Sequence, residues 1–370
     1  MQERLYFMDN AKAAVICLMI VFHAAMAYMV YAPSWWYVVD KEQMLWTDVF
    51  VVWADTFIMP VMFFVSGYFG LASLSRHSQR KFWQKKFVRI GLPWGIGAVC
   101  LAPLIAYMMV FSRHLPISFG EFYHKLFLGE AYQHAHYWYL GVLLLFYLLL
   151  ALGVKVLPKL KEQCCQAPKP YVFVAWMFLA AVGMGITNTF LPDGTWLHPL
   201  YLIVFQPTRL PIYLVTFFVG AYAWHSGWFQ KKGYQPEGIL WGSGFTVLSV
   251  SYILFVFVAP ALLHFSVGKY IAVNALFHAG MAMLATMTII AVMRRYYAGG
   301  TTAFWQKLAA ASYPMYFVHQ FFVLGMNYAV KGLAWPGICK YLLVCLLALP
   351  LTYLVSSYGL RRLPLFNGGK

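Results

Sequence analysis

Charged side chains are scarce in this chain. They make up 10% of its 370 residues, whereas a soluble domain carries roughly 25%. Hydrophobic residues account for 62% of the sequence instead. Water is therefore not the main solvent of this protein, and the apolar runs predict one bundle of helices in lipid rather than several soluble domains.

Cysteine is rare as well, and its spacing excludes several kinds of site. The cysteines show neither a CxxC spacing nor a Cys/His ligand pattern, so we expect no disulfide framework and no metal site. We interpret them as structural thiols: Cys17, Cys100, Cys164, Cys165, Cys339 and Cys345. No P-loop, GxSxG or HExxH motif occurs in a suitable context. ATP hydrolysis, serine-hydrolase activity and zinc-peptidase activity are therefore disfavoured.

Long apolar runs are what the chain does contain. A membrane-spanning helix needs roughly 20 mostly apolar residues, and ten segments meet or approach that length. They are residues 11–31, 47–72, 88–110, 137–157, 171–191, 210–225, 239–260, 270–293, 312–330 and 338–358. The sequence therefore predicts an all-α, polytopic transmembrane bundle of about ten helices, which forms one membrane-embedded domain over residues 1–370.

The first apolar segment also has features of a secretory signal peptide. Arg4 and Lys12 precede the apolar run, and Ala25-Met-Ala27 resembles a cleavage site. The apolar run continues beyond that point, however, and an acidic residue such as Asp9 is unusual at the start of a signal peptide. We therefore interpret the segment as a retained transmembrane helix.

The basic residues gather on one side of the predicted membrane. With the N-terminus in the cytoplasm, 20 of the 27 Lys and Arg residues would lie inside, as the positive-inside rule expects. They are Arg4, Lys12, Arg76, Arg80, Lys81, Lys85, Lys86, Arg89, Lys155, Lys159, Lys161, Lys169, Lys231, Lys232, Arg294, Arg295, Lys307, Arg361, Arg362 and Lys370. Both termini are therefore predicted to be cytoplasmic.

This concentrated positive charge has two interpretations. Anionic lipid headgroups account for most of it, and its placement beside the membrane argues against nucleic acid as a partner. The run from Arg76 to Arg89 is denser than anchoring to lipid requires. A polyanionic cytoplasmic substrate would also be attracted there, so a specific anion site at the end of this run remains open beside the lipid interpretation.

Ionisable side chains in the first two helices are candidates for function, because burying them in lipid is costly. Lys12 and His23 are 11 residues apart, so they share one helix face at an axial separation of about 16 Å. Asp55 reaches a similar depth from the opposite side of the membrane. We therefore expect Asp55 to contact His23 and to favour its protonated form. The alternative is a buried His23 that only bonds a neighbouring carbonyl.

Two later helices carry further polar candidates. His136 and Trp138 open the fourth predicted helix, and Tyr316 and His319 lie in the ninth. His136 sits at an outer interface, where an ordinary contact with lipid headgroups would also explain it. A functional role for His319 and a structural one are both open at this point.

Five short motifs connect these residues in order along the chain. They are Lys12-AAVICLMIVF-His23, Phe63-Phe64-Val65-Ser66-Gly67-Tyr68-Phe69, Lys86-Phe87-Val88-Arg89-Ile90-Gly91-Leu92-Pro93, His136-Tyr137-Trp138 and Ser312-Tyr313-Pro314-Met315-Tyr316-Phe317-Val318-His319. In this order they resemble the motifs of the acyltransferase-3 family of integral membrane acyltransferases. The opening RLYFMD and the SGYF form look closest to its OpgC-like branch, which succinylates periplasmic glucans.

The resemblance implies an acyl-CoA donor, acetyl-CoA or succinyl-CoA, on the cytoplasmic side of a bacterial inner membrane. It implies a carbohydrate hydroxyl as acceptor on the outer side, with no permanently bound cofactor. The residues it assigns to the donor are Lys12, Lys86, Arg89 and Ser66, and those it assigns to the acceptor are His136, Trp138, Tyr316 and His319. Lys replaces the family's usual Arg at positions 12 and 86, and Lys cannot form a bidentate fork on phosphate.

We therefore expect His23 to act as general base on the acceptor hydroxyl, with Asp55 orienting it. A covalent acyl-histidine intermediate is the mechanistic alternative. One rival function is a secondary transporter or flippase for a sugar-containing or anionic substrate, in which the same residues line a path through the membrane. A second rival is a membrane scaffold without catalytic activity, which needs no aligned ionisable residues.

Overall fold

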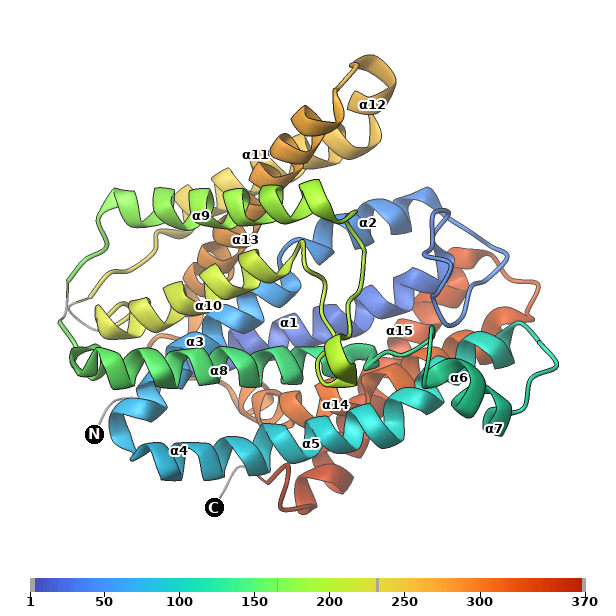
Figure 1. The fold of residues 1–370 in the computed structure, drawn as a ribbon, viewed down its shortest axis with the longest axis horizontal. Coiled ribbons are helices and arrows are strands. Elements are labelled where there is room, and N and C mark those ends of the chain that lie inside the picture. The colour runs from blue at the N-terminus through green and yellow to red at the C-terminus, as the bar shows by residue number, and fades with distance from the viewer. Residues whose placement is uncertain (1–3, 165, 231–232, 368–370) are drawn as a thin grey trace.

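Helices form the architecture in the part of the chain that the computed structural model describes, residues 4–164, 166–230 and 233–367. Within these ranges no strand is formed, and one isolated bridge joins Leu197 and Phe205. Some residues named above lie outside the described ranges: Cys165, Lys231, Lys232 and Lys370. The expectation of an all-α fold is confirmed (Figure 1).

The predicted apolar segments fall on described helices. The described helices are α1 (Tyr6–Ala25), α2 (Leu45–Asp55), α3 (Ile58–Arg76), α4 (Gln79–Lys86), α5 (Leu92–Ile96), α6 (Ala102–Ser112), α7 (Phe119–Glu121), α8 (Trp138–Val156), α9 (Pro170–Phe190), α10 (Leu210–His225), α11 (Gly238–Phe257), α12 (Ala259–Leu262), α13 (Val267–Tyr297), α14 (Ala303–Lys331) and α15 (Gly337–Leu354). The short helices α4 and α7 lie outside the predicted segments. The short π-helical turns η2 (Phe87–Gly91) and η3 (Gly97–Leu101) join α4, α5 and α6 into one long rod.

Eight helical segments among the described residues are long and apolar enough to cross a membrane. They are Tyr6–Tyr28, Leu45–Arg76, Gln79–Ser112, Ala135–Val156, Pro170–Phe190, Gly238–Phe257, Val267–Tyr297 and Gly337–Arg362. The short predicted span at 210–225 is the apolar helix α10. The predicted span at 312–330 lies in α14, which is long enough but less apolar because it buries Ser312, His319, Gln320 and Asn327.

The second span is broken between α2 and α3. Pro60 has no N–H and its ring collides with the carbonyl four residues earlier, so a helix cannot continue unchanged through Thr56. The break falls there: α2 ends at Asp55, and Phe57 has the non-helical angles φ −133° and ψ −20°. Pro60 thus accounts for the break, which leaves Asp55 at the end of a helix.

Both chain ends and the basic run lie at the same end of the bundle (Figure 1). We call this the basic end; there α1 begins and α3 turns into α4 beside Arg76, Lys81, Lys85 and Arg89. The opposite end, called the far end, carries the loop 29–44, the short α7 and the turn between α14 and α15. The helices between the two ends position the site.

A buried ion pair ties the loop 29–44 to the bundle at the far end. Lys340 Nζ donates to both carboxylate oxygens of Asp40, at 2.9 and 3.1 Å, and both side chains are 2% exposed. The backbone N–H of Asp40 donates to Ala27 O at 2.8 Å. Asp48 holds the start of the same loop by accepting from the N–H groups of Val30 and Tyr31 at 2.8 and 2.9 Å. The loop is therefore fixed at both of its ends.

Helices α3 and α10 cross at van der Waals contact of their backbones. A Cβ atom on Gly67 would stand 1.9 Å from Phe217 O, and one on Gly220 would stand 2.1 Å from Phe64 O. No side chain fits at either position, because backbone atoms on both sides would have to move apart. The glycine of the SGYF motif is therefore needed for close packing of the two helices.

Replacing Gly67 with alanine is expected to destabilise the folded protein by about 3 kcal/mol, the upper end of the usual cost of overpacking. The measurement is the thermal unfolding of the purified protein in detergent. Gly325→Ala in α14 is the matched control, because a Cβ there meets nothing within 4 Å, and alanine is the better helix former. Equal melting temperatures for the two variants would contradict the assigned role of Gly67.

Candidate active site

His23 lies in the last turn of α1, where it faces α14. Its Nδ1 is 2.9 Å from Nε2 of His319, and its ring stacks on Trp36 at a centroid distance of 5.8 Å and an interplanar angle of 3°. His319 is fully buried, whereas His23 is half-buried. The imidazole of His23 is therefore fixed on two sides and retains an accessible edge.

The hydrogen bonds of the two histidines determine which nitrogens carry protons when both rings are neutral. Nδ1 of His319 is 2.7 Å from the carbonyl oxygen of Tyr316, which can only accept, so that nitrogen must carry the hydrogen. Nε2 of His319 then accepts, and Nδ1 of His23 donates to it. A neutral His23 consequently has its free lone pair on Nε2, where a proton can be taken up.

The expected contact between Asp55 and His23 is wrong. Asp55 Oδ2 lies 3.5 Å from a guanidinium nitrogen of Arg209, at the start of α10. The partner of His23 Nδ1 is His319 instead. Helix rotation and the break before α3 turn the carboxylate toward α10.

The other predicted histidine and tyrosine join His23 in one cluster. His136 packs its ring 4.6 Å from that of His319, and its Nε2 lies 3.1 Å from Phe317 O. The hydroxyl of Tyr316 donates to the carbonyl oxygen of His136. The start of α8 is thereby pinned to α14 beside His23. Within the described residues, no group of His, Cys, Asp or Glu side chains is arranged to hold a metal ion.

A line of tyrosines connects this cluster with the basic end. Lys86 Nζ lies 3.8 Å above the ring of Tyr147, whose hydroxyl donates to Ser66 O at 3.2 Å. The Ser66 hydroxyl lies 2.8 Å from the Tyr139 hydroxyl, and the Tyr139 ring packs 5.8 Å from that of Tyr316. Ser66 and Lys86 are therefore linked to the histidines through α8.

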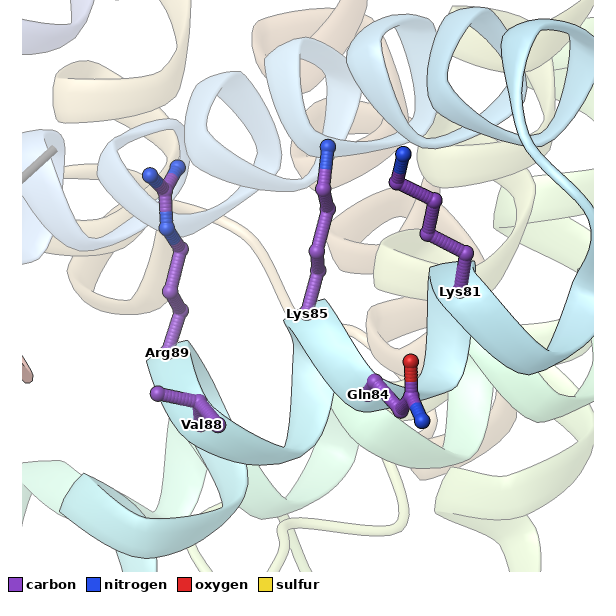
Figure 2. Close-up of a pocket in the computed structure, with 5 residues that line it drawn as sticks. All are labelled: Lys81, Gln84, Lys85, Val88 and Arg89. Carbon is purple, nitrogen blue, oxygen red and sulfur yellow. The ribbon is translucent and has the colours of Figure 1, made fainter. Parts of the chain in front are cut away.

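Lys86 and Arg89 have different surroundings, and their shared part in donor binding stays a prediction. Lys86 covers the rings of Phe82 and Tyr147, whereas Arg89 is exposed. Arg89 instead lines a hollow of about 340 Å³ together with Lys81, Gln84, Lys85 and Val88. Lys81, Lys85 and Arg89 extend in the same direction from one face of the helix (Figure 2). Their spacing of four residues, visible in the sequence, predicts this shared face.

Two more predicted residues lie apart from the histidine cluster. Lys12 is half-buried on α1, three turns nearer to the basic end than His23, so its part in donor binding stays a prediction. Trp138 packs on Trp196 and stacks on Tyr213, with ring centroids 5.6 and 5.7 Å away.

The sequence analysis did not identify Trp36 and Arg209 as functional candidates. The available signals were the adjacent tryptophans 35–36 and an arginine beside a predicted span.

Comparison with known proteins agrees with the motifs. The acyltransferase domain that defines the acyltransferase-3 family matches residues 5–357. Glucans biosynthesis protein C of Escherichia coli K12 is 32% identical over 108 residues, which are 29% of this chain and 27% of that protein. The protein of the same name from E. coli O1:K1 / APEC gives the same identity and coverage. The chain thus matches only about a quarter of the length of these relatives, and no solved structure matches it. Because the domain match extends over nearly the whole chain, this protein belongs to the acyltransferase-3 family.

Proposed function

We propose that the protein transfers an acetyl or succinyl group from cytoplasmic acyl-CoA to a hydroxyl of a carbohydrate on the outer side of a bacterial inner membrane. The observation that carries this proposal is the hydrogen-bonded pair of His23 and His319 between the two ends of the bundle. One end presents cations suited to a phosphorylated donor, and the other presents aromatic rings suited to a sugar.

The proposed reaction assigns a proton-transfer role to Nε2 of His23. The acceptor hydroxyl gives its proton to this nitrogen while its oxygen bonds to the carbonyl carbon of the thioester. The carbon–sulfur bond then breaks, and the proton passes from His23 to the departing sulfur. An ester and the free thiol of CoA are the products. His319, by accepting from Nδ1 of His23, keeps the lone pair of His23 on the reacting side.

The cations at the basic end would bind the donor. Residues spaced by four rise about 6 Å per step along a helix, so Lys81, Lys85 and Arg89 present a row of positive charges. The 3′-phosphate and the pyrophosphate of CoA are anions that such a row attracts. Lys12 lies on the side of α1 that leads from this end to His23, so it would meet the acyl-pantetheine arm on its way inward. Anionic lipid headgroups would occupy the remaining basic surface.

Replacing Arg89 with alanine is expected to weaken acyl-CoA binding about fivefold, because one charge-assisted contact to phosphate is lost at an exposed site. The salt dependence of binding should become shallower as well, since one fewer charge pair is screened. Isothermal calorimetry at two ionic strengths measures both effects. Lys169→Ala is the control, an exposed cation at the start of α9. An unchanged affinity for Arg89→Ala would place the donor elsewhere.

A single assay distinguishes the proposed acyl transfer from transport. Purified protein in detergent is mixed with acyl-CoA labelled in the acyl group and a glucose oligosaccharide, and the carbohydrate is analysed for label. Base-labile label on the oligosaccharide is the expected result. A transporter or flippase would leave the acyl-CoA intact and the oligosaccharide unlabelled in this assay, which has no membrane to cross.

A further inference from the structure

The described residues contain a charged cluster that the transfer mechanism does not use. It consists of Asp55 at the end of α2, Asp193 in the loop after α9 and Arg209 before α10, and we call it the Arg209 cluster. Arg209 donates to Asp193 at 2.9 Å and lies 3.5 Å from Asp55. The Arg209 side chain is 12% exposed, whereas that of Asp55 is 44% exposed. An accessible carboxylate that faced hydrocarbon would be costly, so Asp55 is expected to face water or a substrate.

The two carboxylates differ in how many partners they have. Asp193 accepts two hydrogen bonds from Arg209, one from Thr208 Oγ1 at 2.8 Å and one from the N–H of Gly194 at 3.2 Å. Burial alone would raise the pKa of Asp193, but Arg209, His278 and these hydrogen bonds hold it below its usual value. Asp55 has its ion pair with Arg209 at 3.5 Å and retains lone pairs that no described donor occupies.

The charge of the cluster restricts what it can bind. Two carboxylates surround one guanidinium, so the cluster carries a net charge of about −1 when both acids are ionised. An anionic ligand, including the free carboxylate of a succinyl group, would be repelled by it. Hydroxyl groups suit it better, because each can donate to a free lone pair of Asp55 in a charge-assisted hydrogen bond.

A wall of indole rings leads from this cluster to His23. We call it the indole wall; its members are Trp36, Trp35, Trp196 and Trp138. The ring contacts run from His23 to Trp36 (5.8 Å), Trp35 (6.0 Å), Trp196 (6.5 Å), Trp138 (5.6 Å) and Tyr213 (5.7 Å). Tyr213 follows Arg209 by one helical turn, and its N–H donates to Arg209 O at 3.2 Å. Trp35 is 38% exposed, and Trp138 and Trp196 are half-buried, so all three rings are partly accessible.

We propose that the Arg209 cluster and the indole wall form the binding site of a neutral polyhydroxylated acceptor, with Asp55 accepting from its hydroxyl groups. This inference rests on the proposed transfer to carbohydrate and names the residues that hold the acceptor. Flat apolar faces of sugar rings pack on indoles, and a few placed polar groups orient such a ligand. Arg209 acts here as a positioning residue, because it fixes the carboxylate of Asp55 rather than touching the acceptor.

The test measures binding of a glucose oligosaccharide to the full-length protein in detergent without acyl-CoA, by quenching of tryptophan fluorescence. Asp55→Asn preserves the shape of the side chain but removes its charge, and it is expected to weaken binding on the order of tenfold. Trp196→Ala is expected to weaken binding about fivefold. The matched controls are Glu130→Gln and Trp335→Ala, exposed residues of the same types at the far end, which should bind as the unaltered protein does.

The outcomes separate this inference from the proposed function. Unaltered affinity in both Asp55→Asn and Trp196→Ala, or no oligosaccharide binding by the unaltered protein, overturns the acceptor site even where acyl transfer is observed. Displacement of the oligosaccharide by choline would overturn it too, because a negative cluster beside indoles would then be a cation site. Loss of binding in both variants supports the site, and it does so even if the protein transfers no acyl group, in which case the proposed function alone fails.

Discussion

Replacement of His23 by alanine is expected to lower the rate of acyl transfer by about 10²–10⁴-fold, the usual contribution of a general base. The loss corresponds to about 3–5 kcal/mol of transition-state stabilisation. The imidazole of His23 is held in place by His319 on Nδ1 and by Trp36 on the ring face. The lone pair that can accept a proton is on Nε2. Turnover of labelled acyl-CoA with a glucose oligosaccharide measures the effect.

Two controls make this result specific to His23. His264→Ala removes an exposed loop histidine and should leave turnover unchanged. Affinity of His23→Ala for acyl-CoA should also stay within about twofold, because the row of cations lies on α4 and the turn after it, and Lys12 lies about three turns from His23 along α1. If the purified, folded His23→Ala protein transferred acyl groups at a near-normal rate, the general-base role would be refuted.

Replacement of Lys340 by methionine is expected to destabilise the protein by about 3–5 kcal/mol, because Asp40 would be left as an unpaired buried charge. Both side chains are 2% exposed, so bulk water cannot take the place of Lys340. Asp40 anchors the loop that carries Trp36, and Trp36 stacks on His23. Acyl transfer should therefore fall together with the melting temperature.

A double variant tests whether the loss comes from the unpaired charge. Asp40→Asn with Lys340→Met removes both charges and keeps an oxygen that can accept from the N–H of Glu42, as Asp40 does at 2.9 Å. Most of the stability should return, since no unpaired charge is left in the protein interior. An unchanged melting temperature in Lys340→Met, or a double variant less stable than that single variant, would contradict this account of the ion pair.

The helical architecture was predictable because length and composition are local properties of a span. Ten apolar segments could be located without knowledge of their neighbours, and Pro60 explains the break after Asp55. The least apolar of these segments, in α14, supplies His319, so its polar residues mark a site rather than weakening the assignment of a helix. Family motifs identified His136, Tyr316 and His319, which the structure brings together with His23.

The wrong expectation for Asp55 has a physical cause, which is rotation about the helix axis. The predicted depth of Asp55 does not determine the direction of its side chain, which points to Arg209. Lys86 and Arg89 are three residues apart, yet Lys86 covers aromatic rings whereas Arg89, in the π-helical turn that begins at Phe87, is exposed. The pairing of Arg209 with Asp193 joins a loop to a helix start, and no periodic pattern predicts such a contact.

Sidedness of the reaction tests the central claim most directly, namely that donor and acceptor reach His23 from opposite ends of the bundle. The protein is reconstituted in sealed vesicles with a glucose oligosaccharide inside and labelled acyl-CoA outside. Molecules whose basic end faces outward are identified by the accessibility of that end to added protease. We predict ester-linked label on the enclosed oligosaccharide, and none when His23 is replaced by alanine. Label that appears only when donor and acceptor are on the same side would contradict the account.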